Sequence, residues 1–325
     1  MKTIGILTSG GDSPGMNACI AAVVRRSEVR GLKSVGILRG FEGLVGGSAM
    51  QLDAHSVSGI AGRGGTILET SRDGSLKARL EVGALGRMFA AVGIDALIVL
   101  GGGGSISAAR GISDAGLPVI AVPCTIDNDI AGTDYTIGFD SACNRVIAAA
   151  NDIADTAESL GGRIFLIETL GGESGHIAIS SAYAIGADAV LVPEIKPDLP
   201  VLCGRLKAEM DAGKTYVVIV VAEGAGPAPN LIEPIAELVG RRVRVTALGH
   251  AQRGGPPTYW DRKMARAFGE RAVDLLIDGE CDAMTALAGG VLTETPMSVP
   301  VSTKKPLDEK TYELINTGAK LKAGG

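Results

Sequence analysis

The chain has 325 residues, of which 46% are hydrophobic, and a formal net charge of −5. This length allows a large buried core and favours two lobes, while the mild charge and an aromatic content of 3% argue against a nucleic-acid groove. The five cysteines show no CxxC spacing, which argues against a zinc site and against a disulfide framework.

The first residues lack the layout of a signal peptide, because residues 2–7 contain only a short apolar run. No apolar run elsewhere approaches the roughly 18 residues that span a bilayer. We therefore expect a cytoplasmic protein without a membrane-spanning segment.

The first predicted strand, residues 4–7, leads into a glycine-rich turn at residues 8–17 and a helix at residues 18–24. Such a turn alone is a weak signal, since tight turns without a ligand are at least as common. Residues 34–38 predict a second strand, and a glycine-rich loop at residues 62–66 leads to Arg72. An arginine in such a loop is more often a surface charge than a phosphate ligand.

The central stretch, residues 96–129, predicts a strand, a glycine turn, a helix at residues 106–115 and a second strand. This unit builds phosphate sites at the carboxyl edge of a parallel sheet. The glycines at residues 101–104 let the backbone approach an anion, and we expect Ser105 to cap the helix.

Asp127 and Asp129 follow the second of these strands, two positions apart. One carboxylate there could accept a proton while the other holds a metal ion. The alternative is purely structural, because an Asp-Asn-Asp run is also typical of turns.

The rest of the chain continues the alternation of strands and helices. We expect helices at residues 85–92, 141–160, 177–185, 201–210, 231–239 and 260–277, strands at residues 163–168, 189–192, 216–221 and 244–248, and an irregular tail from Pro296. This alternation is typical of parallel sheets covered on both faces. The predicted fold class is α/β, with two doubly wound, Rossmann-like lobes and mostly parallel sheets.

Ionisable residues gather at the ends of the predicted strands, where ligands bind in such sheets. They are Asp127, Asp129, Glu168, Glu223, His250 and Arg253, with Arg163 and Arg244 at strand starts. Glycine turns, two aspartates and several arginines fit a kinase that acts on a small phosphorylated molecule. His250 taken alone is better explained as a structural histidine beside a glycine turn.

Four segments together resemble the 6-phosphofructokinase family. They read Thr-Ser-Gly-Gly-Asp-Ser-Pro-Gly-Met-Asn at residues 8–17, Pro-Cys-Thr-Ile-Asp-Asn-Asp at residues 123–129, Asp-Tyr-Thr-Ile-Gly-Phe at residues 134–139 and Gly-His-Ala-Gln-Arg-Gly-Gly at residues 249–255. The resemblance implies transfer of a phosphoryl group from ATP, or from pyrophosphate in one branch, to the 1-hydroxyl of fructose 6-phosphate with magnesium. It also implies a homotetramer with shared active sites, a donor-binding lobe (residues 1–138 and 251–303) and a sugar-phosphate-binding lobe (residues 139–250 and 304–325).

The resemblance also implies roles for single residues. Asp127 would be the base, Thr125 would lie beside it, and Asp129 would help to place magnesium. The implied donor-binding residues are Gly11, Arg72, Gly102, Gly103, Gly104 and Ser105, with Arg72 stabilising the transferred group. The implied sugar-binding residues are Thr125, Asp127, Leu170, Gly171, Gly172, Glu223, His250 and Arg253, joined by Arg163 and Arg244 from a neighbouring subunit.

Several positions depart from the family pattern. Gly103 stands where the family has a magnesium-site aspartate, and Gly172 stands where it has an arginine. Phe41, Asp73 and Lys77 alter the donor pocket, and Cys124 matches neither the ATP nor the pyrophosphate branch. A pyrophosphate-dependent enzyme, a sedoheptulose 7-phosphate kinase and a catalytically silent paralogue therefore remain as alternatives to the ATP-dependent enzyme.

Overall fold

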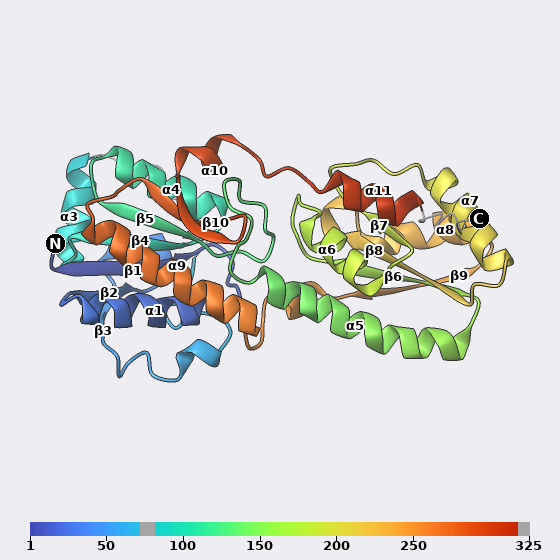
Figure 1. Cartoon of the computed structure of the whole chain (residues 1–325), viewed down its shortest axis with the longest axis horizontal. Coiled ribbons are helices and arrows are strands. Elements are labelled where there is room, and N and C mark those ends of the chain that lie inside the picture. Colours follow the sequence, from blue (N-terminus) through green and yellow to red (C-terminus); the bar gives the residue numbers. More distant parts are fainter. Residues whose placement is uncertain (72–81, 318–325) are drawn as a thin grey trace. The chain divides into compact units, whose positions relative to one another are not determined.

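A computed structural model describes residues 1–71 and 82–317. The chain divides into two compact units, the first of Met1–Ser141 and Arg253–Lys305 and the second of Ala142–Gln252 and Pro306–Gly325 (Figure 1). Each unit contains its own sheet. The α/β fold class with mostly parallel sheets is confirmed.

The first unit is built on a seven-stranded sheet in the order β11-β10-β5-β4-β1-β2-β3. Its strands are β1 (Thr3–Ser9), β2 (Lys33–Ile37), β3 (Ala49–Leu52), β4 (Ala96–Gly101), β5 (Val119–Pro123), β10 (Ala283–Ala288) and β11 (Val291–Pro296). The five inner strands run parallel, and the two edge strands, β3 and β11, pair antiparallel with their neighbours.

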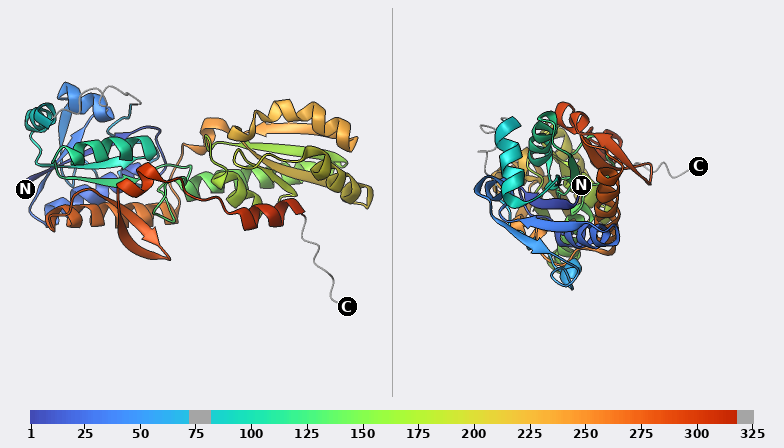
Figure 2. Two further views of the ribbon diagram at one scale, coloured as in Figure 1. Left: turned by 90° about the horizontal axis from the view of Figure 1, so that it is seen from above. Right: turned by 90° about the vertical axis from the view of Figure 1, so that its left-hand side faces the viewer.

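Helices cover both faces of this sheet because successive strand residues point to opposite sides. In β1, Ile4 and Ile6 belong to one apolar core and Leu7 to the other. The first core is closed by α1 (Met16–Val29) and α9 (Tyr259–Ile277), which pack side by side (Figures 1 and 2). The second is closed by α2 (Gly40–Gly46), α3 (Val82–Val92) and α4 (Gly103–Asp114), and α10 (Ser298–Ser302) packs against α4.

The second unit has a four-stranded parallel sheet in the order β7-β8-β6-β9. Its strands are β6 (Arg163–Thr169), β7 (Ala189–Leu191), β8 (Tyr216–Ala222) and β9 (Arg242–Ala247). Helices α7 (Leu199–Asp211) and α8 (Ile232–Val239) pack on one core, and α6 (His176–Ile185) and α11 (Glu309–Thr317) on another. Helix α5 (Phe139–Leu160) begins in the first unit and continues into the second.

The expectation of an irregular tail from Pro296 is wrong, because that segment contains α10 and α11. No element was expected at α2, β3, β10 or β11. Helix α2 and strand β3 are short, and β11 is an edge strand with several exposed residues. Strand β10 is an inner strand, but three of its six residues are alanines and one is a threonine, so that its apolar pattern is weak.

A buried carboxylate fixes the start of α5. The carboxylate of Asp261 in α9 has no exposed surface and accepts hydrogen bonds from the Tyr135 hydroxyl (2.5 Å), the Gly138 amide (2.6 Å), the Ser141 amide (2.8 Å) and the Ser141 hydroxyl (2.5 Å). Burial raises the pKa of Asp261, although these hydrogen bonds oppose the shift. A negative charge at a helix N-terminus is also favoured by the helix dipole.

We predict that Asp261→Asn destabilises the first unit by about 2–4 kcal/mol, because the amide cannot accept all four hydrogen bonds and brings two donors of its own. Asp274→Asn is the matched control on the same helix. Asp274 pairs with Arg26 and Arg30 in a more exposed position, where loss of the charge costs about 1 kcal/mol or less. Thermal unfolding followed by circular dichroism measures both, and equal shifts in the two variants would contradict the assignment.

Candidate functional site

The turn after β1 is enclosed by backbone and hydroxyl hydrogen bonds. Gly10 has a φ of 88°, its amide donates to the Ser71 carbonyl (3.1 Å), and its carbonyl accepts from the Thr70 hydroxyl (2.8 Å). The Thr8 hydroxyl donates to the Glu69 carbonyl (2.7 Å). Gly11 is therefore held in a defined turn at the carboxyl end of β1, followed by the half-buried Asp12.

The glycine turn after β4 brings the backbone against two other segments. A Cβ atom at Gly101 would lie 2.5 Å from the Ser105 Oγ and 2.6 Å from the Ser9 carbonyl oxygen, so that only glycine fits. A Cβ atom at Gly102 would lie 3.5 Å from the Thr125 Cβ. The turn is therefore packed against the start of the aspartate segment.

Helix α4 begins with an uncapped, exposed end. Gly102 is its N-cap residue and makes no side-chain cap hydrogen bond, and Gly103 and Gly104 are exposed. The expectation that Ser105 caps the helix is wrong. The helix begins at Gly103, so that Ser105 is buried within its first turn. The free amides at this helix end suit an anionic group.

The aspartate segment after β5 is a turn with alternating exposure. Ile126 and Asn128 point inward, Asp127 is half-buried and Asp129 is exposed. Asn128 has a φ of 51° in the left-handed region, and its amide donates to the Asp134 carbonyl (3.4 Å). The Thr136 hydroxyl donates to the Thr125 carbonyl (2.7 Å), which ties the turn to the following loop.

Thr125 orients Asp127. The Thr125 hydroxyl donates a hydrogen bond to the Asp127 Oδ2 (3.2 Å) and accepts one from the Asp127 backbone amide (3.2 Å). The threonine is itself buried, with 8% of its surface exposed, so that its rotamer is restricted. A half-buried carboxylate held in this way can accept a proton from a hydroxyl group within hydrogen-bond reach.

The described residues supply few ligands for a metal ion. Within residues 1–71 and 82–317, no group of three or more His, Cys, Asp or Glu side chains is placed to hold one. Magnesium commonly binds one or two carboxylates and completes its coordination with water and substrate phosphates. The exposed Asp129 therefore fits a magnesium ion that arrives with a phosphate donor.

Two arginines of the first unit, Arg72 and Arg253, were predicted to bind phosphate groups, and the structure describes Arg253. An Arg253 guanidinium nitrogen donates to the Asp12 carbonyl (3.3 Å), which joins the segment after η5 (Gly249–Gln252) to the turn after β1. Arg72, like the departures at Asp73 and Lys77, lies outside the described residues.

In the second unit, Glu223 holds the glycine turn after β6. Its Oε1 accepts hydrogen bonds from the amides of Gly171 (3.1 Å) and Gly172 (2.7 Å). Both glycines have positive φ angles, 151° and 57°, and a Cβ at Gly171 would lie 2.5 Å from the Ser174 carbonyl oxygen. The structure thus brings three of the predicted sugar-binding residues together at the carboxyl end of this sheet.

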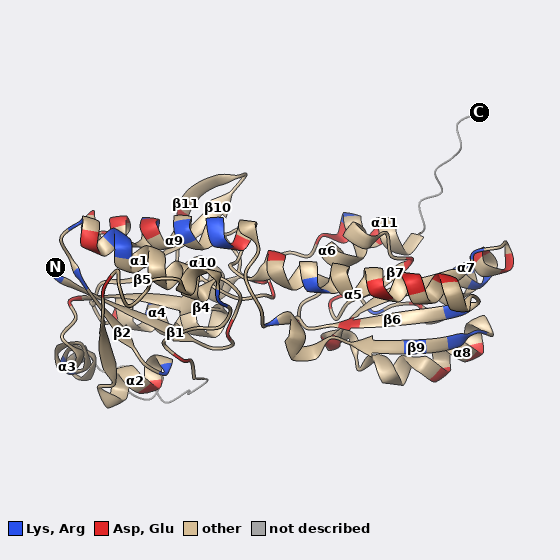
Figure 3. Cartoon of the chain, turned by 90° about the horizontal axis from the view of Figure 1, so that it is seen from below, with Lys and Arg blue, Asp and Glu red and all other residues tan. Residues whose placement is uncertain are grey.

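The remaining predicted residues of this unit are more dispersed. His250 is exposed in η5, which follows β9 at the carboxyl end of the sheet. Arg163 begins β6, as expected. The expectation that Arg244 begins a strand is wrong, because β9 begins at Arg242 and Arg244 is its third residue. Figure 3 shows basic residues in both strands. Six steps along β6 correspond to about 20 Å, so that Arg163 lies far from the glycine turn of its own unit.

Two residues with positioning contacts were given no role by the sequence analysis. The buried Gln252 accepts a hydrogen bond from the Leu170 amide at its Oε1 (2.7 Å), and Asn128 supports the aspartate turn. Gln252 lies within the motif of residues 249–255, and the motif indicated a functional segment. The contact itself could not be predicted, because its partner Leu170 is 82 residues away in the chain.

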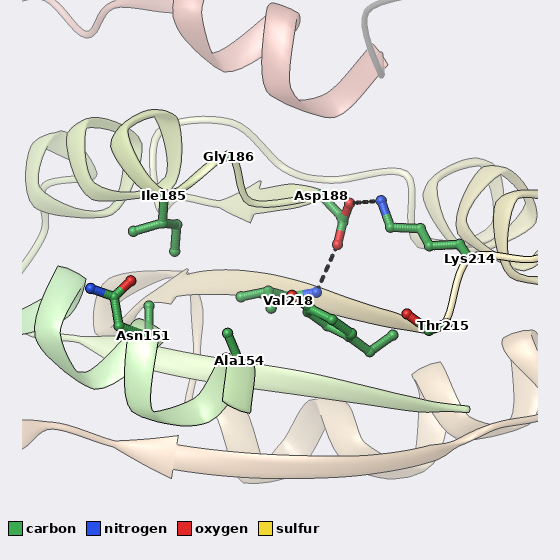
Figure 4. A pocket seen from close by; sticks show the side chains of 10 residues that line it. Asn151, Ala154, Ile185, Gly186, Asp188, Lys214, Thr215 and Val218 are labelled. Atoms are coloured by element: carbon green, nitrogen blue, oxygen red, sulfur yellow. Dashed lines mark hydrogen bonds and ion pairs between the residues drawn. The ribbon is translucent and has the colours of Figure 1, made fainter. Parts of the chain in front are cut away.

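A hollow of about 290 Å³ in the second unit lies away from these residues. Its charged side chains, Asp188 and Lys214, bond to each other, and Asp188 also accepts a hydrogen bond from the Val218 amide (2.8 Å) (Figure 4). Tyr216, the first residue of β8, also lines it, so this hollow is near the amino end of the sheet. Ligands in such folds bind at the carboxyl end, and we therefore place the candidate site elsewhere.

The sequence profile of the phosphofructokinase family matches residues 3–276. The chain is 42% identical to the ATP-dependent 6-phosphofructokinase of Thermotoga neapolitana, over 97% of this chain and 99% of that protein. It is 46% identical to the enzyme of the same name from Natranaerobius thermophilus, over 97% of this chain and 98% of that protein.

Solved structures give a similar result. The phosphofructokinase of Saccharomyces cerevisiae superposes with a TM-score of 0.85 at 28% identity, covering 98% of this chain and 47% of that one. This chain thus spans about half the length of the yeast chain. A pyrophosphate-dependent phosphofructokinase from Nitrosospira multiformis superposes with a TM-score of 0.86 at 20% identity, covering 95% of this chain and 86% of that one, which shows a shared fold. No helix within the described residues is long and apolar enough to cross a membrane.

Proposed function

The chain belongs to the phosphofructokinase family, and from this premise we propose that it is an ATP-dependent 6-phosphofructokinase of glycolysis. The reaction transfers a phosphoryl group from ATP to the 1-hydroxyl of fructose 6-phosphate. The observation that carries the proposal is the Thr125–Asp127 hydrogen bond beside the glycine turn, which presents an oriented carboxylate next to a helix N-terminus.

Asp127 performs the proton chemistry in this proposal. Its carboxylate accepts the proton of the sugar 1-hydroxyl as the hydroxyl oxygen attacks the terminal phosphorus of ATP, and the bond from that phosphorus to ADP breaks. Thr125 keeps the carboxylate oriented through its hydroxyl. General-base catalysis of this kind contributes about 10²–10⁴ in rate.

The turns after β1 and β4 bind the phosphoryl donor. Gly11 and Gly102 bring backbone close to the phosphates, while the exposed amides of Gly103 and Gly104 face them at the positive end of α4. Ser105 supports this turn from its buried position. Arg72 stabilises the transferred group, as the family resemblance implies.

Magnesium bound to ATP neutralises phosphate charge, and Asp129 is the residue that would hold it. Gly103 supplies no carboxylate to assist Asp129. A Cβ atom at Gly103 would meet only the Ile130 Cδ1, at the ordinary contact distance of 3.6 Å, so that an aspartate has room there. Asp129 would therefore hold the ion without a second carboxylate at position 103, and donor phosphates and water would supply further ligands.

Residues of the second unit bind the sugar phosphate. Glu223 shapes the turn of Leu170, Gly171 and Gly172, and His250 belongs to the segment of residues 249–255. Arg253 of the same segment belongs to the first unit, and the family resemblance gives it the same role. The family resemblance assigns Arg163 and Arg244 to the site of a neighbouring subunit. Arg163 lies at the opposite end of its sheet from the glycine turn, which supports this role, and Arg244 lies within β9. A cytoplasmic homotetramer with shared sites therefore forms part of the proposal.

A catalytically silent paralogue is the second candidate function. It is favoured by Gly103, which removes a negative charge from the magnesium site, and by Gly172, which removes a positive one from the sugar site. Such a protein would bind sugar phosphate or nucleotide and regulate an active subunit. Use of pyrophosphate as donor, or of sedoheptulose 7-phosphate as acceptor, would keep the chemistry but change the substrate.

We predict that the purified protein phosphorylates fructose 6-phosphate with ATP and magnesium. Product formation is measured side by side with ATP and with pyrophosphate, and with sedoheptulose 7-phosphate as the competing acceptor. A higher kcat/KM with ATP and fructose 6-phosphate is expected, because the relatives at 42–46% identity carry the name ATP-dependent 6-phosphofructokinase. Product with pyrophosphate alone would overturn the choice of donor.

We predict that Gly103→Asp lowers the magnesium concentration for half-maximal activity by about 3- to 10-fold, because a second carboxylate strengthens a hard-cation site. Gly103→Asn is the matched control, which adds a side chain of the same size without charge. If the parent protein is inactive and Gly103→Asp alone restores activity, the silent paralogue is the correct assignment.

A further inference from the structure

The loop that follows Asp129 is bound along its length by the returning C-terminal part of the first unit. The Asp134 amide donates to the Leu287 carbonyl (2.7 Å), and the Gly289 amide donates to the Asp134 Oδ2 (2.7 Å). The Thr295 hydroxyl donates to the Gly132 carbonyl (2.8 Å). Residues 130–134 are therefore held by the β10–β11 hairpin.

Gly132 permits this close approach. Its φ is 82°, and a Cβ atom there would lie 2.6 Å from the Thr295 Cγ2. The Leu287 amide also donates to the Thr133 hydroxyl (3.0 Å). The hairpin thus defines the path of the loop directly after the exposed Asp129.

The last residues of the first unit complete this support. The backbone of Lys304 forms an antiparallel bridge with Ile130, and the Lys305 ammonium donates to the Asp134 carbonyl (3.0 Å). The same carbonyl accepts the Asn128 side-chain amide (3.4 Å). One oxygen atom therefore connects Lys305 to the turn that carries Asp129.

Lys305 also places a positive charge in this region. It is partly buried, and desolvation lowers its pKa to about 8, although the carboxylates of Asp134 and Asp129 act in the opposite direction. An ammonium group withdrawn from water is stabilised by such carboxylates.

We propose that Lys305 is a positioning residue for phosphoryl transfer, which holds the loop of residues 130–134 and, through the shared Asp134 carbonyl, the turn that carries Asp127 and Asp129. The proposal rests on the proposed function, because only there does this turn take part in phosphoryl transfer. Lys305 touches neither donor nor acceptor in this role. It acts through the Asp134 carbonyl.

Loss of the ammonium group removes the hydrogen bond at the Asp134 carbonyl. Asp129 and the adjoining Asp127 turn can then move away from the productive geometry, which lowers kcat. A purely structural lysine would lower stability without lowering kcat at an unchanged KM.

The test uses Lys305→Met and Lys305→Arg in the full-length protein, with Lys304→Met as the matched control. Lys304 is the exposed neighbour, and its contact with Ile130 is made by the backbone, which the substitution leaves intact. Amide hydrogen exchange of residues 128–137 is measured by mass spectrometry without substrates. We expect about tenfold faster exchange in Lys305→Met, and rates like the parent in the other two variants.

Steady-state kinetics on the same proteins tests the consequence for phosphoryl transfer. For Lys305→Met we expect kcat to fall about tenfold and the KM for fructose 6-phosphate to change less than about twofold. Lys305→Arg keeps a donor at this position and is expected to restore both values to within about threefold of the parent.

Unchanged exchange and kcat in Lys305→Met would overturn the proposal while leaving the proposed function intact. Equal effects in Lys304→Met would also overturn it, since the change would then reflect general loss of positive charge. A parent enzyme that does not phosphorylate fructose 6-phosphate overturns the proposed function and, with it, the role of Lys305 in transfer. The exchange measurement then still decides whether Lys305 holds the loop.

Discussion

The chemistry proposed for this protein depends on how the segment from Thr125 to Asp129 is held at the end of β5. Gly102 packs against Thr125, the Thr136 hydroxyl binds the Thr125 carbonyl, and Asn128 adopts a left-handed conformation. These contacts direct Asp127 and Asp129 outward while Ile126 and Asn128 remain buried. The Thr125 hydroxyl then fixes the Asp127 carboxylate.

The charges around this turn explain how a kinase site can lack the carboxylate that the family has at the position of Gly103. Gly103 contributes only backbone, but it starts α4, whose free amides and dipole favour a phosphate group. Lys305 donates to the Asp134 carbonyl in the loop that follows Asp129. The protein therefore offers a less negative environment than a site with two metal-binding aspartates, which suits an ion carried in by the phosphates of the donor.

Much of the fold and part of the site were predictable from local sequence. Buried strands such as β1 and β4 are continuous apolar runs that end in glycine turns, so that their place could be predicted. The same holds for β5, after which Asp127 and Asp129 follow. The start of α4 was not, because Gly102 takes the N-cap position in place of a polar side chain. Asp261, Gln252 and Lys305 were missed as positioning residues, since each meets partners 82 or more residues away in the chain.

The central claim is that Asp127 is the base for a sugar hydroxyl. It is tested most directly by comparing turnover of fructose 6-phosphate and ATP in the parent and in Asp127→Ser, with sugar-phosphate affinity measured separately by calorimetry. The account predicts that turnover falls by at least about 10²-fold while the dissociation constant changes by less than about threefold. Unchanged turnover in Asp127→Ser would contradict it.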